Sequence, residues 1–337
     1  MRGGFSLVPR EYTEDDVKIR PSSRKSRPRS KDRPAHHEAR PGFVVAIDRG
    51  RYGVVLSDDD SRVSAVRARE LGRRGIVVGD RVGVTGDTSG ATGTLARIIR
   101  LEPRTTALRR TPDDSDPTDR VVVANAQVLG IVTAAADPAP REGFIDRCLV
   151  AALDADLMPL LIVTKTDLAS GEELATGYRA LGVELIRVRQ DGPVTDLVQR
   201  LAGRISVLIG QSGVGKSTLV NRLVPGAERE IGQVNAVTGR GRHTSTSAVG
   251  LPLPGGGWII DTPGLRSFGL GHIDPGRILA AFGELADGAE QCPRGCDHLP
   301  PHCALDDWVA ADGAGPAGAE RLASFRRLLG SVRSELN

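Results

Sequence analysis

The sequence has little of what marks membrane, secreted or fibrous proteins. Its 337 residues include four cysteines, two methionines and 3% aromatic residues. Its longest apolar stretches, such as Met158 to Val163, fall far short of the ~20 residues of a spanning helix, and no signal-peptide core follows Met1. Three cysteines lie between Cys292 and Cys303, which is not a secreted disulfide framework. We therefore expect a cytoplasmic protein without a membrane partner. A monomer is also expected, although these features do not bear on the oligomeric state.

Positive charge is concentrated near the N-terminus, although the formal net charge is only +3. From Lys18 to Arg40 there are nine Lys or Arg residues against two acids, among Pro and Ser. Such a stretch buries too little apolar surface to offset its ordering entropy. Residues 1–40 are thus predicted to be a disordered basic tail. It is either a solubilising leader or an electrostatic arm for RNA, and charge alone does not separate the two.

The rest of the chain divides into three predicted domains. Short β-rich runs over residues 41–103, with a tight turn at Val78-Gly79-Asp80, predict an OB-type barrel. This barrel either binds RNA or has a purely structural role. Residues 104–272 alternate apolar strands with helices, as in a parallel α/β sheet. Residues 273–337 are predicted to form a helical domain, with one helix over 277–285 and another over 320–332. The expected strands of the parallel sheet include 121–123, 129–132, 160–163, 185–188, 205–209 and 258–260.

A phosphate-binding loop follows the apolar run of residues 205–209. Its glycines let successive backbone N–H groups face phosphates at a helix N-terminus. Lys216 would reach the β- and γ-phosphates, and the Ser217 hydroxyl would bind Mg²⁺. The nine residues of the loop are Gly210, Gln211, Ser212, Gly213, Val214, Gly215, Lys216, Ser217 and Thr218.

Two further motifs complete a nucleotide site. Asp261 ends the run of residues 258–260 and is expected to hold the Mg²⁺ shell, while the N–H of Gly264 would meet the γ-phosphate. The stretch Thr164, Lys165, Thr166, Asp167 is similar to the Asn-Lys-x-Asp motif of GTPases. Its carboxylate would accept hydrogen bonds that guanine offers and adenine does not. Thr164 replaces the usual Asn, so a brace on the loop is expected to be lost and guanine affinity to be weaker.

The order of these motifs is unusual. The base-reading motif precedes the phosphate loop, whereas it follows that loop in ordinary GTPases. The sheet is therefore predicted to be circularly permuted, with its motifs still meeting at the carboxyl ends of the strands.

Together with the barrel before it and a Cys/His cluster after it, this order resembles the RsgA (YjeQ) family of ribosome small-subunit-dependent GTPases. Ala124-Asn125, Ile145-Asp146-Arg147 and residues 242–246 also match. The resemblance covers about residue 41 to the C-terminus. It implies a permuted GTPase domain between an OB barrel and a zinc-containing helical domain. It also implies GTP hydrolysis during late maturation of the small ribosomal subunit, with rRNA as a partner. The guanine-contacting loop of the family is usually Ser-rich and is Val188-Arg189-Gln190 here.

The sequence lacks the glutamine that orients the attacking water in many GTPases. Leu265 stands where many GTPases place a water-orienting Gln, so intrinsic hydrolysis is expected to be slow. By resemblance, His243 is the candidate for positioning water, with a solvent-facing loop histidine as the alternative. Thr244 is the first choice to join Ser217 on Mg²⁺. Arg240 and Arg242 would either neutralise transition-state charge or contact RNA.

Four residues near the C-terminus predict a structural zinc site: Cys292, Cys296, His298 and Cys303. A closed Cys₃His set leaves no open position for catalysis. His302 is a spare ligand candidate, and reduced buried thiols are the alternative. Two other functions stay open for the whole chain. One is a nucleotide-switched RNA clamp without useful turnover, and the other is a P-loop kinase or ATPase.

Overall fold

The computed structural model describes residues 39–72, 75–110, 120–179, 182–227, 248–262 and 275–336. The predicted basic tail lies almost wholly outside these residues, as do His243, Thr244, Gly264 and Leu265. Expectations about them stay predictions. None of the helices in the described part of the chain is long and apolar enough to cross a membrane.

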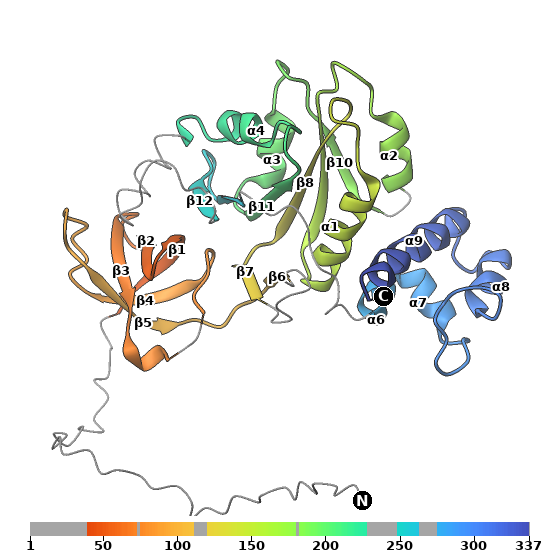
Figure 1. Cartoon of the computed structure of the whole chain (residues 1–337), viewed down its shortest axis with the longest axis horizontal. Coiled ribbons are helices and arrows are strands. Elements are labelled where there is room, and N and C mark those ends of the chain that lie inside the picture. Colours follow the sequence, from red (N-terminus) through yellow and green to blue (C-terminus); the bar gives the residue numbers. More distant parts are fainter. Residues whose placement is uncertain are drawn as a thin grey trace, which may run out of the picture. The chain divides into compact units, whose positions relative to one another are not determined.

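The first part of the fold is a closed barrel of five strands, which confirms the predicted barrel (Figure 1). Strand β1 pairs with both β2 and β4, and β5 joins β3 to β4, so the sheet closes on itself. The barrel has its own apolar cluster, which includes Val44, Leu56 and Ile98. The strands are β1 (Arg40–Asp48), β2 (Arg51–Leu56), β3 (Arg62–Arg67), β4 (Arg81–Gly86) and β5 (Ala96–Leu101), with a 3₁₀ turn at Arg69–Leu71.

The central part is a mostly parallel sheet with helices beside it (Figure 1). Its strand order is β10-β9-β8-β11-β13-β12, and only β12 runs antiparallel to its neighbour β13. All seven residues of β8 are buried, as expected for a Val/Ile/Leu-rich strand covered on both faces. The strands are β8 (Val128–Ala134), β9 (Met158–Thr164), β10 (Glu184–Arg187), β11 (Ile205–Gly210), β12 (Val249–Pro252) and β13 (Trp258–Asp261). The helices are α1 (Glu142–Asp154), α2 (Glu172–Arg179), α3 (Thr195–Leu201) and α4 (Lys216–Leu223).

One expected strand of this sheet lies elsewhere. Residues 121–123 belong to β7 (Arg120–Ala124), which pairs with β6 (Ala107–Arg110) in a separate two-stranded antiparallel sheet. An apolar run of three residues does not distinguish a central strand from a hairpin strand, because both bury their side chains.

The tight turn at Val78-Gly79-Asp80 is tied to the strands that follow the barrel. The fully buried carboxylate of Asp80 accepts hydrogen bonds from Arg104 at 2.7 and 2.8 Å. Gly79 has a φ of 95°, and a Cβ there would lie 2.0 Å from the carbonyl oxygen of Ala124. The amide of Asn125 donates to the Gly79 carbonyl at 2.9 Å. Ala124 and Asn125 therefore hold this turn in place.

Residues 275–336 contain four helices: α6 (Pro275–Ala280), α7 (Gly283–Ala289), α8 (Ala304–Ala310) and α9 (Gly318–Leu336). The single helix predicted over 277–285 is wrong, because the chain leaves helical geometry between α6 and α7 at Phe282 (φ −112°, ψ 71°). The buried ring of Phe282 packs edge-on against Phe325 of α9, with ring centroids 5.6 Å apart.

Helix α9 is anchored on α1 by a buried carboxylate. Asp146, which is 2% exposed, accepts hydrogen bonds from Arg327 at 2.9 and 3.2 Å and from the Tyr178 hydroxyl at 2.9 Å. Burial, together with the charge of Asp146, raises the pKa of Tyr178, so this hydroxyl stays protonated as a donor. The predicted motif Ile145-Asp146-Arg147 thus contributes a helix–helix anchor.

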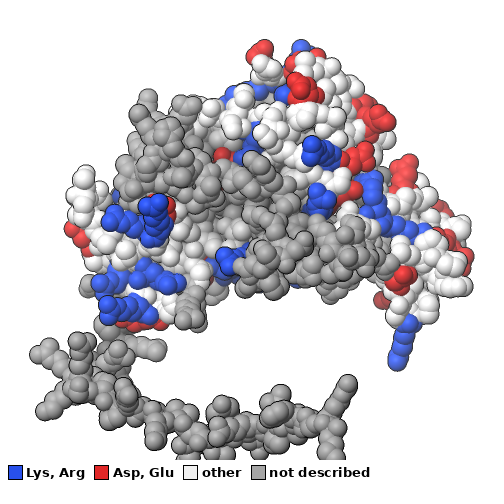
Figure 2. All heavy atoms as spheres, in the orientation of Figure 1, with Lys and Arg blue, Asp and Glu red and all other residues white. Residues whose placement is uncertain are grey.

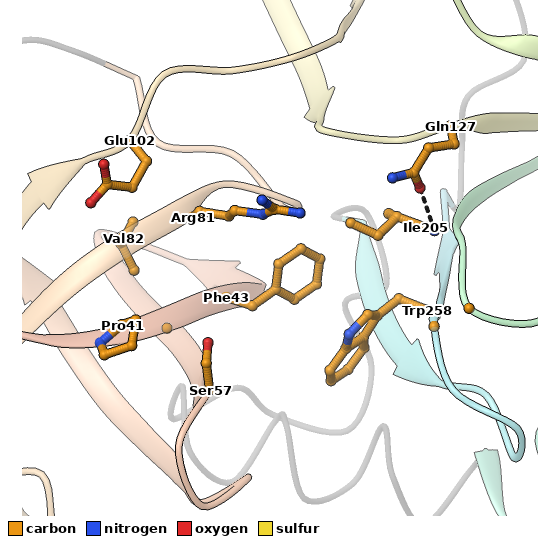
Figure 3. A pocket seen from close by; sticks show the side chains of 12 residues that line it. Pro41, Phe43, Ser57, Arg81, Val82, Glu102, Gln127, Ile205 and Trp258 are labelled. Atoms are coloured by element: carbon orange, nitrogen blue, oxygen red, sulfur yellow. Dashed lines mark hydrogen bonds between the residues drawn. The ribbon is translucent and has the colours of Figure 1, made fainter.

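Barrel strand β1 meets the parallel sheet at β12 and β13. Ala46 pairs with Val249, and the ring of Phe43 lies 5.0 Å from that of Trp258 (Figure 3). A cavity of about 610 Å³ opens beside these rings. Gln127 and Ile205 also line this cavity, and the Gln127 side chain accepts a hydrogen bond from the Ile205 N–H at 2.6 Å (Figure 3).

Candidate nucleotide site

The motifs predicted from the sequence meet at one edge of the parallel sheet. Thr164 ends β9, Gly210 ends β11 and Asp261 ends β13. Strand β8 separates β9 from β11, and β13 is the other neighbour of β11. Because these strands are parallel, their carboxyl ends share one edge, where α/β sheets bind nucleotides.

The phosphate loop turns between β11 and α4 with two glycines in the left-handed region, Gly213 (φ 82°) and Gly215 (φ 86°). Gly210 has no room for a side chain, since a Cβ there would lie 2.7 Å from the Val132 carbonyl oxygen. At the start of α4, the Lys216 ammonium contacts the Asp261 carboxylate. Both side chains are largely buried, at 12% and 20% exposure. The two charged residues predicted for the phosphate end are therefore side by side.

The base-reading motif touches the phosphate loop directly. The Thr164 hydroxyl lies 2.5 Å from the Val214 carbonyl oxygen and 3.1 Å from that of Thr133. Its single proton serves one acceptor at a time, and the shorter distance favours Val214. The brace expected to be lost with Asn is thus supplied by a hydroxyl. Sequence reasoning missed this because a β-branched Thr at a strand end gives no signal of a partner 50 residues away.

The two charged residues of the motif, Lys165 and Asp167, have different partners. Lys165 (φ 53°) directs its ammonium to the carbonyl oxygen of Asp137. Asp167 is exposed and accepts a hydrogen bond from the Gln190 N–H at 2.9 Å. This backbone donor lowers the pKa of Asp167 below its usual range, with smaller contributions from nearby Arg189 and Lys165. The carboxylate is therefore ionised at neutral pH, as an acceptor for guanine requires.

A cavity of about 140 Å³ lies between the base-reading motif, the loop after β10 and helix α4. Its lining includes Gly215 and Thr218 of the phosphate loop, so one cavity touches both ends of the predicted site. The other lining residues are Thr164, Lys165, Val188, Arg189, Gln190, Leu219 and Arg222. Sequence reasoning missed Arg222, because nothing in its local sequence marks it as part of this cavity.

The four predicted metal ligands also come together. One ligand atom from each of Cys292, Cys296, His298 and Cys303 lies within 4.8 Å of every other. The Cys292 sulfur is 3.7 Å from His298 Nδ1 and 3.9 Å from the Cys303 sulfur. Four ligands at ~2.3 Å from a tetrahedral Zn²⁺ would be separated by roughly 3.8 Å, so the donor set and its spacing fit zinc. His302 is exposed and is not one of the four.

The segment that carries the four predicted metal ligands is held by the helices around it. Arg326 of α9 donates to the His298 carbonyl at 3.0 Å and binds Asp306 of α8 through two hydrogen bonds of 2.7 Å. Burial raises the pKa of the Cys303 thiol to about 11. Loss of solvation disfavours its thiolate, which a bound cation would stabilise.

A phosphate loop and an upstream base-reading motif, meeting at the edge of one parallel sheet, define a circularly permuted GTPase. The RsgA GTPase family model matches residues 101–271. The small ribosomal subunit biogenesis GTPase RsgA of Ectopseudomonas mendocina is 41% identical over 245 residues, which is 70% of each chain. Its namesake in Pseudomonas aeruginosa (strain LESB58) is 38% identical over 303 residues, covering 86% of this chain and 85% of the relative. This chain belongs to the RsgA GTPase family.

Solved structures agree with this assignment. YjeQ from Thermotoga maritima superposes with a TM-score of 0.65 at 25% identity, covering 87% of this chain and 98% of that one. YloQ, described as a circularly permuted GTPase, has a TM-score of 0.64 at 23% identity, covers 90% and 98% of the two chains, and supports the fold. The predicted fold class and GTP hydrolase activity are therefore confirmed, and the kinase or ATPase alternative is not favoured.

Proposed function

We propose that this protein binds GTP with Mg²⁺ at the shared edge of β9, β11 and β13. We further propose that it acts as a monomer on the small ribosomal subunit and hydrolyses GTP during late maturation. The observation that carries the nucleotide assignment is the direct contact of Thr164 with the phosphate loop at Val214. The subunit as partner is supported by the name of the relatives, small ribosomal subunit biogenesis GTPase.

Each end of the site has a proposed role in this reaction. Residues 210–218 surround the phosphates with backbone N–H groups, and Asp167 accepts hydrogen bonds from guanine. The Ser217 hydroxyl and the Asp261 carboxylate are hard oxygen donors of the kind Mg²⁺ prefers. When bound, Mg²⁺ neutralises charge that develops on the phosphates. His243 positioning water, Thr244 joining the Mg²⁺ shell and Gly264 meeting the γ-phosphate complete the proposal.

The ion pair between Lys216 and Asp261 fits these roles. In the proposed complex the Lys216 ammonium turns to the phosphates and the Asp261 carboxylate turns to the Mg²⁺ shell. The ammonium then has another negative partner in place of the carboxylate, and the carboxylate has another positive partner in place of the ammonium. Neither charge is then left unpaired in a largely buried position, which would be costly.

Contact with rRNA is proposed to involve the barrel. Figure 2 shows Lys and Arg side chains gathered over this part of the molecule. Its exposed arginines include Arg51 of β2, Arg67 of β3, and Arg97 and Arg100 of β5. A surface of this kind binds the phosphate backbone in a salt-dependent way. The only two aromatic residues of the five strands, Phe43 and Tyr52, are buried, which favours backbone contacts over base stacking.

The Cys₃His cluster is proposed to hold one structural Zn²⁺. Its ligands come from the segment between α7 and α8, which has no regular secondary structure of its own. A tetrahedral ion would fix this segment against the surrounding helices. Metal analysis of the purified protein is expected to give one zinc per chain in the parent and less in a Cys296→Ser variant.

The decisive experiment measures GTP turnover alone, with purified small subunits and with large subunits as the control. We expect slow hydrolysis alone, strong stimulation by small subunits and none by large ones. Binding to small subunits without phosphate release would favour the nucleotide-switched clamp instead. Tight ATP binding by the parent protein would contradict the guanine assignment.

A further inference from the structure

We propose that Arg222 is a positioning residue that sets guanine specificity, by bracing the loop of residues 188–192 from the far end of the phosphate-loop helix. This inference rests on the proposed nucleotide site. Arg222 lies in the last turn of α4, the helix that begins at Lys216. An eight-residue helix is roughly 12 Å long, so one rigid element reaches from the phosphate end of the site to the base end.

The brace consists of two hydrogen bonds from one guanidinium. Arg222 Nη1 donates to the Arg189 carbonyl at 2.9 Å, and Nη2 donates to the Gly192 carbonyl. The planar fork of an arginine suits two carbonyl oxygens that face the same way. The turn between the two carbonyl groups is tight at Gly192, because a Cβ added to this glycine would lie 3.0 Å from the Arg189 Cβ.

This loop needs a brace because it has little burial to hold it. Val188 is buried, but Arg189, Gln190 and Asp191 are exposed. Backbone hydrogen bonds tie the loop to the rest of the sheet at Val188, which donates to the Val163 carbonyl at 2.8 Å. Beyond that point, the contacts with Arg222 and Asp167 determine where the loop lies.

The position of the loop determines the orientation of the base-reading carboxylate. The Gln190 N–H donates to Asp167 Oδ1 at 2.9 Å, and both Gln190 and Arg222 line the 140 Å³ cavity. A carboxylate discriminates guanine only if it is held where the ring N–H and exocyclic amine arrive. Loss of the brace would therefore free Asp167 while leaving the phosphate loop unchanged.

The test compares GTP with ITP. The base of ITP lacks the exocyclic amine from which Asp167 would accept a hydrogen bond. Affinities are measured by displacement of N-methylanthraniloyl-GDP from the parent, Arg222→Ala, Arg222→Lys and Asn221→Ala. Asn221 is the matched control, because it is exposed on the same turn of α4. Thermal melting verifies that each variant is folded.

We expect the parent and Asn221→Ala to prefer GTP over ITP by about tenfold or more, the usual effect of a hydrogen bond to a charged group. Arg222→Ala should reduce this preference to about twofold, mainly through weaker GTP binding. Arg222→Lys keeps the charge but not the fork, and should resemble the alanine variant.

Equal weakening of GTP and ITP in Arg222→Ala would overturn the specificity role and leave only a structural one. Full recovery in Arg222→Lys would overturn the two-carbonyl brace, because charge alone would then suffice. ATP is included as a third competitor, and a parent protein that does not prefer GTP over ATP would instead contradict the proposed nucleotide site. That outcome is distinct from a parent that prefers GTP and is unaffected by Arg222→Ala.

Discussion

The two ends of the nucleotide site are built in different ways. The phosphate end comes mainly from one continuous stretch, residues 210–218, and its charged pair Lys216–Asp261 is largely buried. The base end is assembled from three separate segments, residues 164–167, residues 188–192 and Arg222, and its carboxylate is exposed. In the proposed site, affinity for phosphates would therefore be a local property of the chain. Choice of base would depend on how distant segments are held together.

The largest expected effect is at the phosphate end. Lys216→Ala removes the ammonium that would bind the β- and γ-phosphates and leaves Asp261 without its partner. We expect GTP turnover to fall by about a thousandfold or more, because charge on the transferred phosphoryl group is no longer neutralised. Phosphate release with small subunits present checks this, and retention of a tenth of parent turnover would contradict it.

Asp167→Asn should act on the choice of base. The variant keeps the size of the side chain but presents an amide that can donate where guanine also donates. We expect GTP affinity to fall by roughly a hundredfold, with ATP affinity still weak. Equilibrium displacement with both nucleotides measures this. If GTP affinity were unchanged, another residue would have to read the base.

Thr164→Val should weaken the link between the two ends. The substitution keeps the β-branched shape and removes the hydroxyl that lies 2.5 Å from the Val214 carbonyl. Loss of one neutral hydrogen bond is worth about 1 kcal/mol, or roughly fivefold in affinity. The effect should be equal for GTP and ITP, because the phosphate loop moves and the base loop does not. A selective loss of GTP would assign Thr164 to the base end instead.

The smallest expected effect is that of acid on base choice. The Gln190 N–H holds the pKa of Asp167 below its ordinary value, so the carboxylate loses its charge only at a pH lower than usual. The GDP-to-IDP affinity ratio should therefore stay constant from about pH 7.5 to about pH 5, above the ordinary aspartate pKa of about 3.9. Taking a ratio cancels titration of the phosphates. A ratio that falls through this window would mean that the pKa of Asp167 is raised above its ordinary value instead of lowered.

What the sequence could predict follows the same division. The phosphate loop and the Cys₃His set are short-range patterns whose spacing already dictates their geometry, and the structure brings both sets together. Parallel strand topology was also accessible, because strands buried on both faces are continuously apolar. The fork of Arg222 and the hydroxyl of Thr164 were not accessible. Their partners are 30 to 50 residues away and are backbone carbonyls, which every residue carries.

Two misassigned elements have a related cause. The hairpin strand β7 and the break between α6 and α7 depend on what each segment packs against. Phe282 leaves the helical path as its ring meets Phe325, 43 residues further on. Local propensity is a weak guide where tertiary contacts decide the backbone.

The salt bridge between Asp146 and Arg327 bears on how this protein can be shortened. A chain cut before α6 would leave the buried carboxylate of Asp146 without Arg327 and would expose the side of α1 that α6 and α9 now contact. Helix α9 therefore packs on the GTPase domain as part of its structure and is not an independent module. Fragments ending at residue 272 should be tested for solubility before any loss of activity is ascribed to the missing Cys₃His residues.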